Sequence, residues 1–154
     1  FGMAMDNLTS RGWIQPIHDF IDRGGHFFGI CLGFQLLFSS SEEFGCHKGL
    51  GVIPGDVVRF SEDDLKVPHM GWNTVDLIKG APAFAGIPTG SYFYFIHSFY
   101  PEVHDRNWVI GEVEYGNTFP CIVGKGNVIA TQFHPEKSHT VGLKIIENFV
   151  RGLC

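Results

Sequence analysis

The sequence feature that most constrains the fold is the pentapeptide Gly-Ile-Cys-Leu-Gly at residues 29–33, which closes an apolar run. A nucleophilic residue between two glycines at this spacing predicts a strand that turns sharply into a helix, with Cys31 exposed at the strand's carboxyl end. We expect a side chain in place of either glycine to clash where the backbone turns. A helix is expected over residues 34–39, and its amino terminus would favour the thiolate form of Cys31. The backbone amide of Leu32 is then placed to donate a hydrogen bond to an oxyanion.

A second set of polar residues precedes the last expected helix. His134 and Glu136 are two positions apart at the end of an expected strand, so both side chains point to one side of the backbone. A carboxylate beside an imidazole fixes its tautomer and supports the imidazolium that forms when it takes a proton. Together with Cys31, this pair is typical of a nucleophile of the Cys–His–acid type.

Each motif also has a plainer interpretation. Cys31 could be a buried cysteine where a strand packs against a helix, because short glycine motifs also occur without function. His134 could simply end the strand, and Glu136 could precede a helix, where acidic residues are favoured. The combination of the two motifs favours the catalytic interpretation over either alternative.

The order of helical and β-rich segments predicts an α/β fold in a single domain over residues 1–154. The aromatic run at residues 91–98 predicts a strand covered on both faces. Turns are expected at Pro54-Gly55 and Gly126-Asn127. Helices are expected to end near Gly12 and to span residues 16–24 and 138–152. Further strands are expected at residues 56–60, 72–78, 108–115, 120–124 and 128–133.

Composition excludes several classes of protein. The chain has 154 residues, of which 44% are hydrophobic and 18% charged, as in globular proteins. A formal net charge of −5 argues against nucleic-acid binding. No apolar run reaches the roughly 20 residues that span a bilayer. The histidines lack metal-ligand spacing, so we expect no metal site and no cofactor. The four scattered cysteines favour reduced thiols in the cytoplasm.

The motifs at residues 29–33 and 134–136 resemble those of the class I (triad) glutamine amidotransferase family. Residues 49–55, 66–73 and 133–138 are similar to one branch of it, the glutaminase subunits of imidazole glycerol phosphate synthase in histidine biosynthesis. The resemblance covers essentially the whole chain. It implies a three-layer α/β fold with a mixed, mostly parallel sheet and helices on both faces.

The resemblance also implies a role for individual residues. Cys31 would attack the side-chain amide of L-glutamine, with His134 as base and Glu136 orienting it, and water would cleave the resulting thioester. An acid suits the substrate's α-ammonium, and an amide suits its ammonium or carboxylate. The residues that the resemblance places around the substrate are Gln35, Glu43, Ser98 and Phe99. Without the resemblance, Gln35 and Glu43 would be read as a solvated helix face and a helix end.

The resemblance implies a partner as well. Ammonia reacts as a nucleophile only when unprotonated, so a channel into a (β/α)₈-barrel cyclase is expected, forming a heterodimer that makes imidazole glycerol phosphate and aminoimidazole carboxamide ribotide. The apolar character of the segment around Trp72 suits an interface core, although Met70 and Trp72 could instead fill the domain core. The residues expected at the interface or channel are His69, Met70, Trp72, Asn73, Tyr94 and Lys137.

The sequence departs from the family at its beginning. The family's opening segment supplies the first strands of the sheet and a glycine-rich loop that completes the oxyanion hole, and this chain is expected to lack both. Of two donors, only the Leu32 amide would remain, and the loss of one donor typically costs roughly 10²–10³ in rate. The alternatives that remain open are an amidotransferase subunit for anthranilate or aminobenzoate synthesis, a partner-independent cysteine hydrolase, and an inactive fragment.

Overall fold

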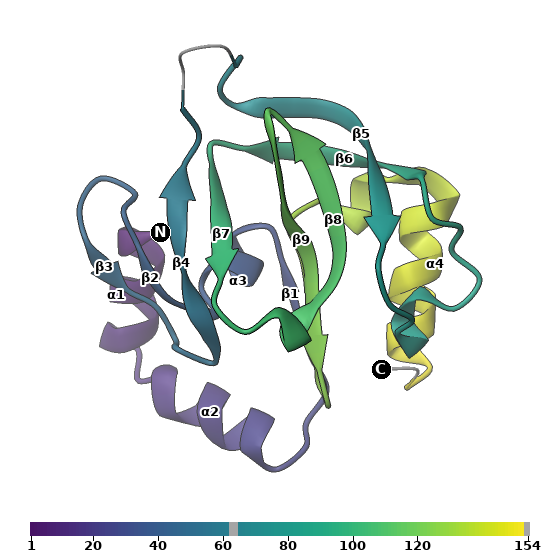
Figure 1. Cartoon of the computed structure of the whole chain (residues 1–154). Helices are drawn as coiled ribbons and strands as arrows, with labels where there is room; N and C mark the ends of the chain where they lie inside the picture. The colour runs from purple at the N-terminus through teal and green to yellow at the C-terminus, as the bar shows by residue number, and fades with distance from the viewer. Residues whose placement is uncertain (62–64, 153–154) are drawn as a thin grey trace.

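The computed structural model describes residues 1–61 and 65–152. Figure 1 shows helices at both ends of the chain and strands between them. The helices are α1 Gly2–Ser10, α2 Ile14–Asp22, α3 Leu32–Gln35 and α4 His139–Val150, with short 3₁₀ turns at Pro82–Phe84, Arg106–Trp108 and Pro135–Lys137. The strands are β1 Phe27–Ile30, β2 Phe38–Ser41, β3 His47–Lys48, β4 Ile53–Arg59, β5 His69–Leu77, β6 Ser91–His97, β7 Phe99–Val103, β8 Val109–Tyr115, β9 Asn117–Lys125 and β10 Val128–Thr131.

The strands form two sheets. The larger sheet has the order β1-β10-β9-β8-β5-β6, and the smaller has the order β3-β2-β4-β7. The two meet where β7 packs on β9, with the rings of Tyr100 and Phe119 5.0 Å apart between centroids. The α/β class and the mixed sheet therefore agree with the sequence prediction.

Strand direction differs from the prediction of a mostly parallel sheet. Among the described strands only β1 with β10 and β2 with β4 pair in parallel, and every other pair is antiparallel. The reason lies in the connections, because a tight turn can join only antiparallel neighbours. Gly116 joins β8 to β9, and the predicted turn at Gly126-Asn127 joins β9 to β10.

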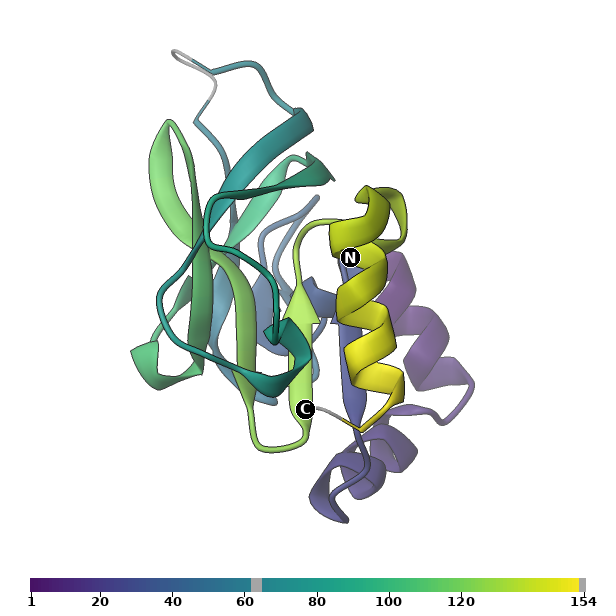
Figure 2. The same ribbon diagram turned by 90° about the vertical axis from the view of Figure 1, so that its right-hand side faces the viewer.

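Helices cover both faces of the sheet at β1, as a three-layer fold requires. Phe28 points to one face and packs against Phe149 of α4, with ring centroids 5.1 Å apart. Phe27 points to the other face, where it joins a cluster with Ile14, Ile17 and other apolar residues of α1 and α2. Figure 2 shows α4 beside β1 and β10. This alternation along one strand follows from the two-residue period of β structure.

Several element boundaries differ from the sequence prediction. Residues 38 and 39, predicted as the end of a helix, belong to β2, because this segment pairs with β3 and β4. Pro54-Gly55 lies inside β4, beside an irregularity in its pairing with β2, and not in a turn. The aromatic strand β6 is not covered on both faces, since Tyr92 is 61% exposed and alternates with buried Phe93 and Phe95.

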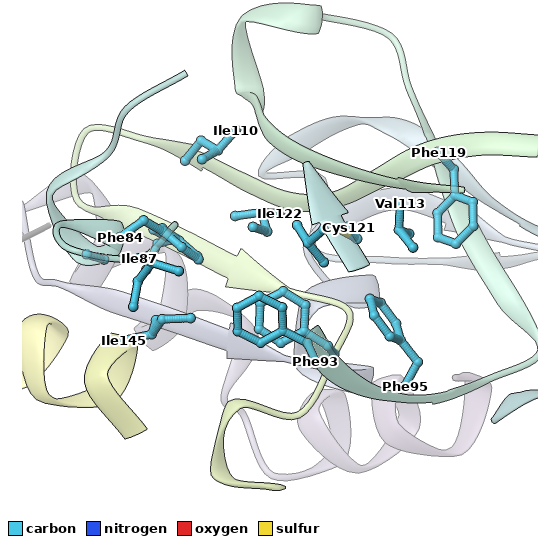
Figure 3. Packing of buried hydrophobic residues seen from close by; sticks show 14 of the residues in the cluster. Phe84, Ile87, Phe93, Phe95, Ile110, Val113, Phe119, Cys121, Ile122 and Ile145 are labelled. Atoms are coloured by element: carbon cyan, nitrogen blue, oxygen red, sulfur yellow. The ribbon is translucent and has the colours of Figure 1, made fainter. Parts of the chain in front are cut away.

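The main core lies between the larger sheet and α4. Figure 3 shows its side chains, among them Phe93 and Phe95 of β6, with Ile145 of α4 on one side. The rings of Phe93 and Phe133 stack with centroids 4.1 Å apart. Because Phe133 directly precedes His134, this packing fixes the segment that carries the expected base.

Candidate active site

Cys31 occupies a strained turn between β1 and α3. Its backbone has φ 51° and ψ −104°, a conformation that a non-glycine residue adopts only when its surroundings impose it. A Cβ atom on Gly29 would lie 2.8 Å from the Gly33 carbonyl oxygen, so glycine is required there. Gly33 itself has open space around it, which contradicts the expected clash at that position. The turn therefore has the predicted geometry, but only the first glycine is sterically essential.

The parallel pairing of β1 with β10 brings the two sequence motifs together. Ile30 pairs with Thr131, and the Cys31 amide donates to the Thr131 carbonyl at 2.8 Å. His134 and Glu136 follow immediately after this strand, and His134 Nδ1 lies 2.7 Å from Glu136 Oε1. A nucleophile and an imidazole–carboxylate pair, about a hundred residues apart in sequence, thus lie at the ends of adjacent strands.

The loop that carries His134 is fastened to β6 by a residue that the sequence did not single out. Ser138 is buried, and its hydroxyl donates to the His134 carbonyl at 2.6 Å while accepting from the Tyr94 amide at 3.0 Å. The His134 amide donates to the Tyr94 carbonyl at 3.0 Å. These bonds hold the backbone of His134 on both sides. Sequence reasoning missed Ser138 because one of its two partners, the Tyr94 amide, lies on a distant strand.

The surroundings of Cys31 favour the thiol over the thiolate. Its sulfur lies 3.9 Å from the Ile96 carbonyl and 3.9 Å from the Gln132 amide nitrogen, and His134 is not among its hydrogen-bond partners. Burial raises the pKa of the thiol, and the negative charge of Glu136 adds to this, although the Leu32 backbone N–H, Lys137 and the Gln132 amide oppose it. A base is therefore needed to generate the nucleophile.

A cavity of about 360 Å³ opens beside the sulfur. All four residues expected around the substrate line it, together with Cys31 and Leu32. The remaining lining residues are Phe1, Phe44, Arg59, Ile96 and His97. The turn at Cys31, the loop after β2 and the connection between β6 and β7 therefore all contribute to the wall of one cavity.

Two of the lining residues present oxygen atoms to a ligand. Gln35 donates through Nε2 to the Phe99 carbonyl at 2.9 Å and to Gln132 Oε1 at 3.0 Å, which uses both amide hydrogens. Its own amide oxygen is therefore the group that remains for the cavity. Glu43 lines the same cavity and contributes a carboxylate group. Both side chains present oxygen atoms that can accept hydrogen bonds from an ammonium group.

A chain of hydrogen bonds links the cavity to β5, and its direction follows from one carbonyl group. The Phe99 carbonyl can only accept, so His97 Nδ1, 2.8 Å away, carries a proton. His97 Nε2 then accepts from His69 Nδ1 at 3.0 Å, and His69 Nε2 accepts from the Asn73 amide at 3.3 Å. Both imidazoles are neutral, because burial lowers the pKa of His69 to about 4 and that of His97 to about 3.

One face of the β5–β6 pair exposes apolar side chains. Met70 stands opposite Ile96 and Trp72 opposite Tyr94, and Met70, Trp72 and Ile96 are 58%, 45% and 36% exposed. The exposure of Met70 and Trp72 contradicts the alternative that they fill the core. His69 differs from the other expected interface residues, since it is only 3% exposed and lies beneath this face. Asn73 is half-buried and Lys137 is exposed.

The described residues offer no group of three or more His, Cys, Asp or Glu side chains that could hold a metal ion. Cys46 is exposed and Cys121 is buried, and neither forms a disulfide, whereas Cys154 lies outside the described residues. None of the described helices is long and apolar enough to cross a membrane.

Comparisons with known proteins relate this geometry to a family. A model of the class-I glutamine amidotransferase family matches residues 5–153. The imidazole glycerol phosphate synthase subunit HisH of Syntrophotalea carbinolica is 51% identical, and the alignment covers 97% of this chain and 75% of that protein. The subunit of the same name from Methanocaldococcus jannaschii is also 51% identical, with 99% and 76% covered. The chain thus spans about three quarters of the length of these relatives.

Solved structures share the fold at low identity. PurLQS from Thermotoga maritima matches with a TM-score of 0.71 at 18% identity, over 92% of this chain and 68% of that chain. A glutamine amidotransferase from the same organism matches with a TM-score of 0.61 at 19% identity, over 93% of this chain and 54% of that chain. These similarities support the same three-layer α/β fold.

Proposed function

The chain belongs to the class I glutamine amidotransferase family, and we propose that it is the glutaminase subunit of imidazole glycerol phosphate synthase in histidine biosynthesis. The observation that carries the proposal is the position of Cys31 on a strained elbow, beside the His134–Glu136 pair and at the wall of a cavity. The identity of about half of all residues to HisH subunits favours the histidine pathway over anthranilate or aminobenzoate synthesis.

The proposed reaction hydrolyses L-glutamine to glutamate and ammonia. The Gln35 oxygen and the Glu43 carboxylate hold the α-ammonium, while Ser98 and Phe99 line the same cavity. His134 takes the proton of Cys31, the sulfur attacks the side-chain amide carbon, and the Leu32 amide donates to the developing oxyanion. His134 then gives its proton to the leaving nitrogen, which departs as ammonia.

The second half of the reaction regenerates the enzyme. A water molecule gives a proton to His134 and attacks the thioester carbon, and the Cys31 sulfur leaves and recovers its proton. Glu136 accepts a hydrogen bond from His134 Nδ1 throughout, which holds the imidazole with Nε2 free for these transfers. One water is consumed for each glutamine, and no metal or cofactor takes part.

The ammonia passes to a separate (β/α)₈-barrel cyclase in the proposed heterodimer. Near neutral pH, ammonia released into water would mostly become ammonium, which is not nucleophilic. The exposed face with Met70 and Trp72 on β5 and Tyr94 and Ile96 on β6 is suited to dock this partner, because apolar and aromatic side chains form interface cores. Ile96 also lies next to the Cys31 sulfur, so this face begins where ammonia would be released.

Two related assignments complete the proposal. Residues 1–154 form one amidotransferase domain, which is supported by contacts between the two sheets through β7 and β9. The cytoplasm is the proposed compartment, because a nucleophilic thiol stays reduced there.

The experiment that tests the function measures glutamate release from glutamine. The chain is assayed alone and with the separately prepared barrel cyclase and its nucleotide ligand, using Cys31→Ala as the inactive variant and Cys46→Ala as the matched control. Release that depends on this partner and on Cys31 is expected. Stimulation only by an anthranilate synthase component would indicate that the chain serves anthranilate synthesis instead. Turnover of an activated ester without any response to glutamine would show a cysteine hydrolase instead.

A further inference from the structure

Gln132 is a buried polar side chain next to the nucleophile. It follows β10, two residues before His134, and none of its surface is exposed. Burying an amide is unfavourable unless its donor and acceptor are both used. Its backbone amide donates to the Cys121 carbonyl at 2.8 Å. The remaining question is which partners the buried side-chain amide has.

The orientation of the Gln132 amide is fixed by its neighbour. Gln35 Nε2 can only donate, so the Gln132 atom 3.0 Å away is the oxygen. The nitrogen of the Gln132 amide must then point to the other side, where it lies 3.9 Å from the Cys31 sulfur. Gln35 is itself held by the Phe99 carbonyl at 2.9 Å. The hydrogen bonds that join Phe99, Gln35, Gln132 and Cys31 therefore allow only one assignment of donors and acceptors: Gln35 donates to Phe99 and to Gln132, and Gln132 donates to Cys31.

We propose that Gln132 is a positioning residue that acts on both halves of the active site: its NH₂ group stabilises the Cys31 thiolate, and its oxygen aims the carbonyl of Gln35 into the cavity. The first effect arises because a thiolate is a stronger hydrogen-bond acceptor than a thiol. The second arises because Gln35 with both hydrogens engaged can offer the cavity only its oxygen. The second half of the proposal rests on the proposed glutaminase function, and the first does not.

The charged groups near the sulfur act on it differently from this donor. Glu136 opposes the thiolate, and Lys137, which is exposed on the 3₁₀ turn after His134, favours it through its charge. His134 is paired with Glu136 and is proposed as the base, so it does not serve as a fixed neutral donor to the sulfur. Gln132 and the Leu32 backbone N–H are thus the neutral donors directed at the sulfur among the described residues.

The test titrates the Cys31 thiol by its rate of alkylation with iodoacetamide as a function of pH, read by mass spectrometry of the Cys31 peptide. Gln132→Met keeps the length of the side chain but removes donor and acceptor. We expect the pKa of Cys31 to rise by about one unit, which lowers its alkylation rate near pH 7 about tenfold. The exposed thiol of Cys46 is the internal reference, and Gln15→Met on α2 is the matched control.

A double-mutant cycle separates this role from a loss of packing. Gln35→Met frees the Gln132 amide to turn, so it should raise the pKa of Cys31 in the wild-type background and leave it unchanged in the Gln132→Met background. Additive shifts, or an unshifted thiol in both single variants, would overturn the proposal. Circular dichroism checks that each variant is folded, and the Gln35→Met arm decides the matter if Gln132→Met does not fold.

Kinetics with glutamine provide a separate readout. Gln132→Met should raise KM about tenfold in addition to lowering kcat, because Gln35 is no longer aimed at the substrate. An unchanged KM would refute the second half of the proposal. If the wild-type chain with its cyclase partner releases no glutamate, the proposed function fails, and the thiol titration still decides whether Gln132 stabilises the thiolate.

Discussion

The neutral pair His69–His97 should make the stability of the fold depend strongly on pH. The unfolded chain binds a proton on each imidazole below the ordinary pKa of 6.5, whereas the folded chain does so only near pH 4 for His69 and pH 3 for His97. Stability from the pair is therefore complete above pH 6.5 and is lost as the pH falls from there toward 3. Protonation of His97 would also place an N–H group opposite the N–H group of His69, so the hydrogen bond between the two rings would be lost.

The size of the effect follows from these values. At pH 5 the medium is about 1.5 units below the unfolded pKa, and each unit is worth about 1.4 kcal/mol per histidine, so each loses about 2 kcal/mol and the pair about 4 kcal/mol. Both rings are buried, which limits screening by solvent. The result at pH 5 depends little on the folded pKa values, because both lie at or below about 4.

The assay is urea unfolding at pH 8, 6.5 and 5 for the wild type and for His69→Phe. Phenylalanine keeps the stacking of His69 between Phe95 and Tyr115 but cannot titrate. The pH-dependent part of the unfolding free energy should fall from about 4 to about 2 kcal/mol. His18→Phe on α2 is the control and should keep the full dependence. An equal dependence in the wild type and His69→Phe would refute the reasoning.

Three further outcomes are expected. Cys31→Ala and His134→Ala should each abolish glutamine hydrolysis, and a binding titration should show unchanged affinity for the cyclase. Turnover at the wild-type rate by either variant would rule out the mechanism. Ser138→Ala should lower kcat about tenfold with little change in KM, since it frees the backbone of His134 and not the substrate cavity, whereas a change in KM alone would contradict this role. Trp72→Ala should weaken binding to the cyclase by about 2 kcal/mol in calorimetry, as for a central aromatic residue of an interface, while Trp13→Ala, which removes an exposed tryptophan outside this face, should not.

The arrangement of Cys31 and of the His134–Glu136 pair could be predicted because its signals are local in sequence. The Gly-Ile-Cys-Leu-Gly motif indicates a tight turn at Cys31, which Gly29 allows, and two polar residues two positions apart at a strand end lie on the same side. The turn at Gly126-Asn127 and the last helix were equally local. In each case the physical cause of the structure lies within a few residues of the motif.

The features that the sequence analysis did not predict depend on residues that are distant in the sequence. The pattern of apolar and polar residues at positions 38–41 is compatible with either a helix or a strand. The segment is a strand because it pairs with β4. From the sequence, His69 was expected at the interface together with Met70. Its burial is explained by His97 on the neighbouring strand, which accepts its hydrogen bond. Gln132 belongs to a motif whose obvious members are His134 and Glu136, and its meaning comes from Gln35.

The central claim is that Cys31 carries the glutamyl group during turnover, and it can be tested directly. The chain with its cyclase partner is mixed with glutamine, quenched in acid, and digested for mass spectrometry of each cysteine-containing peptide. A glutamyl thioester on the Cys31 peptide is predicted, with none on the Cys46 peptide and none when glutamate replaces glutamine. Continued glutamate release without any adduct on Cys31, or with the adduct on another residue, would contradict the claim.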